Sequence, residues 1–94
     1  MIVVRESFIA KPSMAGKMAR MMKSVFSEIP GVRVKVMTDL TGKFNKVVLE
    51  TELDNLQAFE QRMQDYATNP AWRDRMSGYT EMYMTGKREI FQII

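Results

Sequence analysis

Apolar and polar residues follow a period of two in part of the chain, which predicts β-strands. The stretch 32–39 alternates most strictly, and 45–53 returns after a turn at 41–43, so these two stretches predict a hairpin. Residues 2–10 are rich in β-branched and aromatic side chains, and 87–94 are rich in Ile and Phe. We therefore expect four strands.

A period of three to four residues predicts a helix between the first two strands. Ser13 is the expected N-cap, and the Pro-Gly pair at 30–31 ends the segment. The apolar stripe of this helix consists of Met14, Met18, Met21, Met22, Val25 and Ile29.

Two further helices are predicted between the third and fourth strands. Asp54 with Gln57 resembles a capping box, and Asn69 followed by Pro70 restarts the pattern as a cap and a first-turn proline. Gly86 is expected to end the third helix. The two stripes comprise Leu56, Phe59, Met63 and Tyr66 and then Trp72, Met76, Tyr79 and Tyr83.

The resulting order is that of a ferredoxin-like α+β domain, βαββαβ, with an extra short helix before the last strand. Residues 1–94 are expected to form one domain with a four-stranded antiparallel sheet. Right-handed crossovers place the first strand between the third and fourth, with the second at an edge and the helices on one face. On the open face, Arg5 is expected to pair with Glu50 or Glu52. The other residues expected there are Val3, Ser7, Ile9, Arg33, Lys35, Met37, Val48, Phe91 and Ile93.

Composition narrows the chemistry and predicts association. The chain has 94 residues, 14 Lys and Arg against 11 Asp and Glu, and neither Cys nor His. Disulfides, thiol nucleophiles, histidine bases and Cys/His zinc sites are therefore excluded. The apolar runs are too short for a membrane span or a signal-peptide core, so we expect a cytoplasmic protein without a membrane partner. A chain of this size buries only about 60–65% of its unfolded surface, so a homodimer through the open sheet face is expected.

Several short motifs resemble the dimeric α+β barrel superfamily. The matching pieces are 8–12 (FIAKP), 30–31 (PG), 50–52 (ETE), 56–59 (LQAF) and 69–72 (NPAW), which together span nearly the whole chain. Within the superfamily, the pattern is similar to antibiotic-biosynthesis-monooxygenase-like and NIPSNAP-like proteins. The resemblance implies two ferredoxin-like subunits whose sheets pair into a barrel.

The resemblance leaves the reaction open, because the superfamily includes cofactor-free oxygenases, isomerases and haem-degrading enzymes. Haem-degrading members use a histidine where this chain has about Met76. Haem ligation of that kind is not expected, and we expect no cofactor and no metal.

The candidate site is centred on Glu6, on the more apolar face of the first strand, which the helices should cover. The resembled family has a polar pocket residue near this position. In apolar surroundings the carboxyl would hold a proton more tightly than in water and could act as a general base. The other polar residues expected in the pocket are Thr51 and Gln92, and its walls are expected from Trp72, Met76, Tyr79 and Tyr83.

Less specific interpretations stay open for each feature. A register slip of one residue would turn Glu6 to the opposite face, where it would form a salt bridge. The aromatic stripe and the ten methionines suit an ordinary core as well as a pocket. Nucleic acid is not an expected partner, because Phe44 lies only at the edge of the third strand and Glu50 and Glu52 would repel phosphate.

Three functions are therefore compatible with the sequence. The chain could be a cofactor-free monooxygenase-like enzyme acting on a small aromatic or apolar molecule, with Glu6 as base. It could instead bind such a molecule without catalysis, or serve as a structural or interaction dimer.

Overall fold

The computed structural model describes residues 1–94 and has the order of elements that the sequence predicts. None of its helices is long and apolar enough to cross a lipid bilayer. The elements are β1 (Ile2–Ala10), α1 (Ala15–Phe26), β2 (Arg33–Thr38), β3 (Lys46–Leu53), α2 (Leu56–Thr68), α3 (Pro70–Arg75), the short 3-10 helix η1 (Tyr79–Glu81) and β4 (Tyr83–Gln92).

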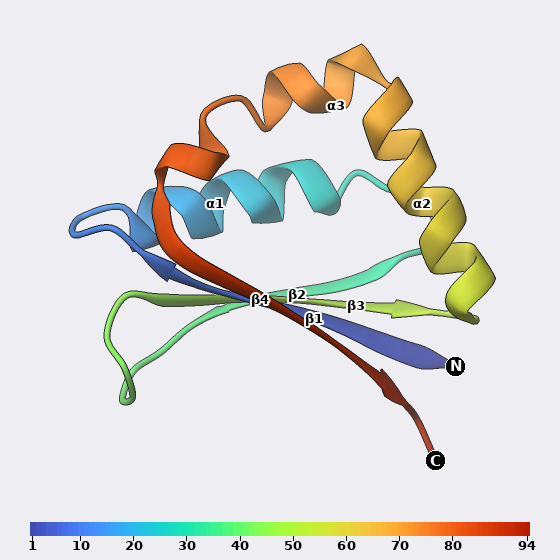
Figure 1. The fold of residues 1–94 in the computed structure, drawn as a ribbon, viewed down its shortest axis with the longest axis horizontal. Coiled ribbons are helices and arrows are strands. Elements are labelled where there is room, and N and C mark those ends of the chain that lie inside the picture. The colour runs from blue at the N-terminus through green and yellow to red at the C-terminus, as the bar shows by residue number, and fades with distance from the viewer.

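One antiparallel sheet forms the base of the molecule. Its strand order is β2-β3-β1-β4, so β1 is central and β2 lies at an edge, as predicted. The helices cover one face of the sheet and leave the other face bare (Figure 1). This confirms the ferredoxin-like α+β class.

The register of β1 assigns neighbouring residues to opposite faces, because successive side chains in a strand alternate. Val4, Glu6 and Phe8 lie on the face that the helices cover, and Val4 and Phe8 are buried there. Arg5 lies on the open face, opposite Glu50, and its Nε donates a hydrogen bond of 2.7 Å to Glu50 Oε2. The predicted facing of the strand and the Arg5–Glu50 pair are both confirmed.

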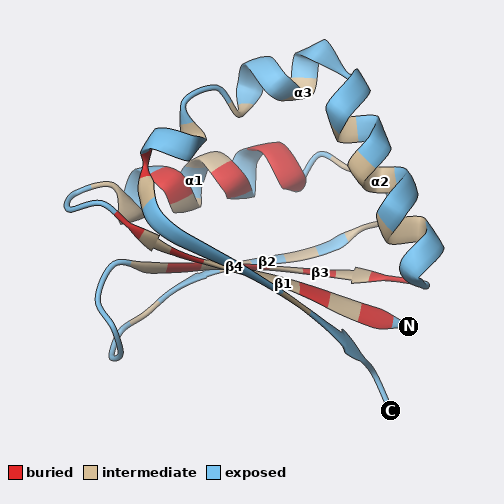
Figure 2. Cartoon of the chain, viewed as in Figure 1, coloured by how far each residue is buried: buried red, intermediate tan, exposed pale blue.

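The tightest packing lies between α1 and the sheet. Helix α1 contributes four buried side chains, whereas α2 and α3 contribute none (Figure 2). The main core cluster consists of Phe8, Ala10, Met18, Met22, Val25, Phe26, Val47, Leu49 and Met82. The helical layer is therefore closed over α1 and looser under α2 and α3.

Two of the three predicted helix caps are wrong. Ser13 has a φ of 71° and makes no cap, so α1 begins without a side-chain cap. Asn55, not Asp54, caps α2, and its Oδ1 accepts a 2.9 Å hydrogen bond from the N–H of Ala58. An Asn side chain accepts such a bond as readily as Asp, so the choice depends on where the β3 ladder ends. The cap by Asn69 at the start of α3 is confirmed.

The predicted third helix is too long, because β4 begins at Tyr83. Tyr83 pairs with Ala10 of β1, and its ring lies 4.8 Å from that of Phe8. A Cβ at Gly86 would lie 3.3 Å from the Phe8 ring, so this glycine leaves room for the ring and does not end a helix. Pairing with β1 prevails over the helical spacing of the aromatic residues.

Both chain ends lie at the same end of the sheet, where β1 starts and β4 finishes (Figure 1). The N–H of Ile93 donates a hydrogen bond of 3.0 Å to the carbonyl oxygen of Met1. The antiparallel β1–β4 pairing thus holds the two termini side by side.

Candidate functional site

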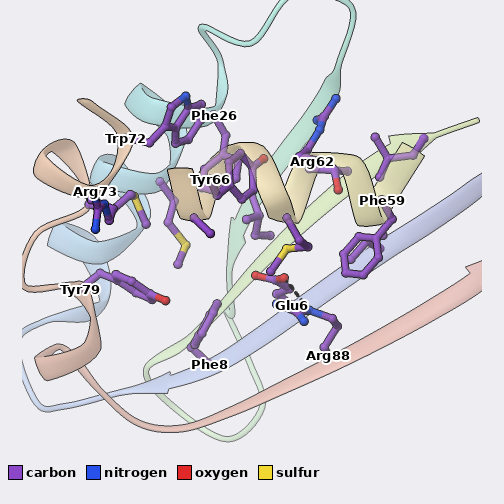
Figure 3. Close-up of a pocket in the computed structure, with 18 residues that line it drawn as sticks. Glu6, Phe8, Phe26, Phe59, Arg62, Tyr66, Trp72, Arg73, Tyr79 and Arg88 are labelled. Carbon is purple, nitrogen blue, oxygen red and sulfur yellow. Dashed lines mark hydrogen bonds and ion pairs between the residues drawn. The ribbon is translucent and has the colours of Figure 1, made fainter. Parts of the chain in front are cut away.

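A cavity of about 380 Å³ lies between the helix-covered face of the sheet and the α2–α3 segment (Figure 3). Its lining comprises 18 residues, of which 13 are hydrophobic. Residues of β1, β3 and β4 form the floor, and residues of α2 and α3 form the roof. Met22 and Phe26 of α1 close one side, and Tyr79 of η1 closes another.

The cavity lies beneath the apolar stripe of α2, which is only partly buried: Phe59 packs against the small core cluster of Ile2, Val4 and Leu53, and Tyr66 packs against the main core cluster. Phe59, Met63 and Tyr66 follow the helical spacing predicted from the sequence, and all three line the cavity. No residue of α2 is fully buried. The stripe therefore borders the opening as well as packed core.

Three aromatic rings form the end of the cavity nearest α1. The ring centroids of Phe26 and Trp72 are 5.3 Å apart, and those of Tyr66 and Trp72 are 4.8 Å apart. Phe26 also meets Tyr66 edge to face at 5.7 Å. Such tilted arrangements are favourable for aromatic pairs, and they present an apolar wall to the cavity.

Glu6 lies on the cavity floor and forms an ion pair with Arg88, the residue opposite it on β4 (Figure 3). Arg88 Nε donates a hydrogen bond of 2.8 Å to Glu6 Oε1, and its guanidinium lies 5.3 Å from the ring centroid of Phe59. Glu6 therefore lies in the predicted pocket, but an arginine that the sequence did not predict holds it there through one oxygen.

Two tyrosine hydroxyls of the lining are held in their protonated form. Burial raises the pKa of Tyr66 to about 12, and the nearby Arg62 offsets that effect only in part. Burial also raises the pKa of Tyr79, and the neighbouring Tyr83 adds to the rise. Both hydroxyls can therefore donate hydrogen bonds into the cavity at neutral pH.

The structure brings most of the predicted site residues together. The lining includes Glu6, Thr51, Trp72, Met76 and Tyr79.

Gln92 and Tyr83 lie outside the lining. Gln92 pairs with Ile2, four residues along β4 from Arg88, and is too far along the strand to join Glu6. Tyr83 stacks on Phe8 beneath η1 and so belongs to the packing around β1.

Sequence reasoning missed the contribution of α2 and of the arginines. The stripe of α2 was visible, but only the third helix was expected to provide the roof. Arg88 could be found only from the register between β1 and β4, which are far apart in the sequence. Among the lining residues missed are Phe59, Arg62, Met63, Tyr66, Arg73 and Arg88. No group of three or more His, Cys, Asp or Glu residues is placed to hold a metal ion.

The comparisons with known proteins define the fold. No protein-family model matches the chain, and no curated protein matches it. An uncharacterised NIPSNAP domain protein from Burkholderia xenovorans superposes with a TM-score of 0.84 at 12% identity, covering 100% of this chain and 95% of its own. A NIPSNAP family protein from Agrobacterium tumefaciens gives 0.83 at 11% identity, covering 97% and 90%.

A third solved structure shows that the fold is also similar to that of a second group of proteins. An antibiotic biosynthesis monooxygenase superposes with a TM-score of 0.74 at 10% identity, covering 100% of this chain and 99% of its own. Identities this low concern the fold and do not carry the reaction across. The resemblance expected from the sequence is thus confirmed at the level of the fold: the chain has the ferredoxin-like fold that these NIPSNAP and antibiotic biosynthesis monooxygenase proteins share.

Proposed function

We propose that the chain binds a small aromatic or apolar molecule in the cavity between the sheet and α2–α3. The observation that carries this proposal is the cavity itself, whose volume of about 380 Å³ and mostly hydrophobic lining surround one polar pair, Glu6 and Arg88. Ligand sites typically combine an apolar wall of this size with a few polar groups that orient the ligand. The rings of Phe26, Tyr66 and Trp72 suit a flat ligand.

The test is a cavity-blocking substitution with a matched control on the same helix. Ala67 lines the cavity, so Ala67→Phe would place a ring in it without removing a core contact. Gln64 lies outside the lining and is exposed, so Gln64→Phe adds the same ring to α2 away from the cavity. Calorimetric titration with a panel of aromatic compounds should show binding to the wild type and to Gln64→Phe, and none to Ala67→Phe. Equal binding by all three proteins, or by none, would refute the proposal.

A catalytic form of this function is the second candidate, and the Glu6 carboxylate favours it. Arg88 engages Oε1, which leaves Oε2 free to accept a proton from an acidic C–H or O–H group of the ligand. A cofactor-free monooxygenase-like enzyme would use such a base to activate its substrate toward dioxygen. Oxidation of a CH₂ group to C=O by O₂ releases one water, and the substrate supplies the electrons.

Glu6→Gln separates catalysis from binding. The amide keeps the shape of the side chain and removes its charge and its basicity. With a bound panel compound, the variant should lose oxygen consumption while its affinity changes little. Unchanged turnover would exclude Glu6 as the base, and the non-catalytic ligand-binding function would stand.

We further propose that two chains associate through the open sheet face. Apolar side chains there, among them Val3, Val48 and Phe91, surround the Arg5–Glu50 pair. The small size of the chain and its resemblance to dimeric α+β barrels support this arrangement. The cavity lies on the other side of the sheet, so both cavities of such a dimer would stay accessible.

A further inference from the structure

The charged residues of the cavity lining are mostly arginines. They are one acid, Glu6, and three bases, Arg62, Arg73 and Arg88. Glu6 and Arg88 neutralise one another. Arg62 and Arg73 take part in none of the ion pairs of the chain, so the lining carries an excess of two positive charges.

Arg62 is the more informative of the two. It lies on α2 between Tyr66 and Phe59 (Figure 3), and its Nη1 is buried without a hydrogen-bond partner. A guanidinium stays ionised at all relevant pH values, and a buried N–H group without an acceptor is costly. The chain itself therefore provides no hydrogen-bond acceptor for Arg62 Nη1.

The neighbouring acids are engaged elsewhere. Asp65 Oδ1 accepts a hydrogen bond of 3.1 Å from Gln61 Nε2, and Glu28 pairs with Arg75. Glu6 is paired with Arg88. No carboxylate of the chain forms an ion pair with Arg62.

The charge balance indicates from which side an acceptor would reach Arg62. Its side chain also borders a more polar depression across α2, whose charged lining residues are the acids Glu28 and Asp65 and the bases Arg62 and Arg75. That depression is neutral, whereas the cavity is positive and mostly apolar. An anion is therefore favoured in the cavity, where Glu6 is the one acid that would repel it.

We propose that the cavity takes an apolar acid, a molecule with an aromatic or alkyl body and one carboxylate or similar oxyanion that pairs with Arg62. This deepens the proposed function and rests on it. The body would lie against Tyr66 and Trp72, and the oxyanion would accept the N–H groups that now lack a partner. Arginine suits this role because its planar fork binds an oxyanion through two parallel hydrogen bonds.

Matched pairs of acid and amide test the charge alone. The probes are 2-naphthoate with 2-naphthamide, and octanoate with octanamide, each titrated calorimetrically into the wild-type chain. A buried charge-assisted pair predicts that an acid binds about ten- to a hundredfold more tightly than its amide. Arg62→Gln should abolish this preference by weakening the binding of the acid. Arg20→Gln, the same change on the exposed surface of α1, should keep it.

Each alternative outcome has a distinct meaning. Equal affinity of acid and amide for the wild type would overturn the inference and leave the proposed function standing. A preference that survives in Arg62→Gln would overturn the role of Arg62. Binding of none of the four probes would refute both proposals. Arg62 forms none of the ion pairs of the chain, so its replacement should not unfold the protein, and a thermal melt checks this.

Discussion

The two faces of the sheet differ in what covers them but carry the same arrangement of side chains. On the open face, Arg5 of β1 pairs with Glu50 of β3 at 2.7 Å. The guanidinium of Arg5 lies 5.1 Å from the ring centroid of Phe91 on β4. An ion pair on the central strand is thus flanked by an aromatic ring that the arginine covers.

The helix-covered face repeats this arrangement with the charges exchanged between strands. Glu6 of β1 pairs with Arg88 of β4 at 2.8 Å, and Arg88 lies 5.3 Å from the ring centroid of Phe59 on α2. The arginine and glutamate side chains are 45% and 21% exposed here, against 42% and 19% for the pair on the open face. A helical layer that sealed this face would lower those values. The comparison shows that α2 and α3 enclose the cavity without drying its floor.

The same substitution at two adjacent β3 positions that face opposite sides of the sheet should give the largest difference in stability. Val47 and Val48 are neighbours whose side chains point to opposite faces, and Val47 is fully buried. Val47→Asp would leave an unpaired charge in the core and should cost about 3–5 kcal/mol, enough to unfold a small domain. Val48→Asp should leave the circular dichroism spectrum native and, if the open face joins two chains, convert a dimer to a monomer by light scattering. A dimer that persists in Val48→Asp would exclude this face as the interface.

Packing on the helix-covered face is tighter under α1 than under α2, and substitutions of two methionines test this difference. Met18 of α1 is fully buried, whereas Met63 of α2 borders the cavity. Met18→Ala should cost about 2–5 kcal/mol in urea unfolding, because it leaves a void in close-packed surroundings. Met63→Ala should cost about 1 kcal/mol or less, because it enlarges an existing opening. Equal costs would mean that α2 packs as tightly as α1.

Alkaline titration probes the helix-covered side alone, where all three tyrosines lie. The pKa of Tyr66 is raised from 10.0 to about 12, so the folded chain holds this proton more tightly than the unfolded chain. That contribution to stability is complete below pH 10 and is lost as the pH rises toward 12. Tyrosinate absorbance should show a late phase in the wild type, and Tyr66→Phe should remove its part near pH 12, while the raised pKa of Tyr79 leaves the remainder. Ionisation of every tyrosine near pH 10 in the folded chain would contradict the burial of Tyr66.

The Arg5–Glu50 and Glu6–Arg88 ion pairs should make similar and small contributions to the free energy of unfolding. Both are partly hydrated, so Glu6→Gln and Glu50→Gln should each cost less than about 1 kcal/mol, and high salt should reduce both losses. Chemical unfolding of the two variants side by side measures the difference. A much larger loss for Glu6→Gln would show that the cavity excludes water from its floor.

Local pattern was sufficient to predict the sheet. Alternation along β1 predicted that Glu6 faces the helices and that Arg5 reaches Glu50, because the period of a strand assigns every side chain to one face. Strand order followed from the handedness of the crossovers, which depends on the chain as a whole and not on particular residues.

Pairings between distant segments limited what could be predicted of the site. Arg88 opposes Glu6 only through the β1–β4 register, which shifts between Ile9 and Ala10. The start of β4 at Tyr83 depends on the same pairing, and helical spacing of the aromatic residues obscured it. Whether a helix fills or spans the space above a sheet depends on tertiary packing, so the stripe of α2 could not reveal the cavity.

The adjacency of the two chain ends has a consequence for the order in which the sheet assembles. β1 and β4 are neighbours in space but lie at opposite ends of the chain, so their pairing closes the longest loop in the fold. A circular permutant that joins Ile94 to Met1 through a short linker and opens the chain between β2 and β3 would turn this pair into a local hairpin. The sequence separation between contacting residues would fall for the β1–β4 pair and rise for the β2–β3 pair. The permutant would therefore begin folding at the floor of the cavity, and the wild-type chain at the edge hairpin.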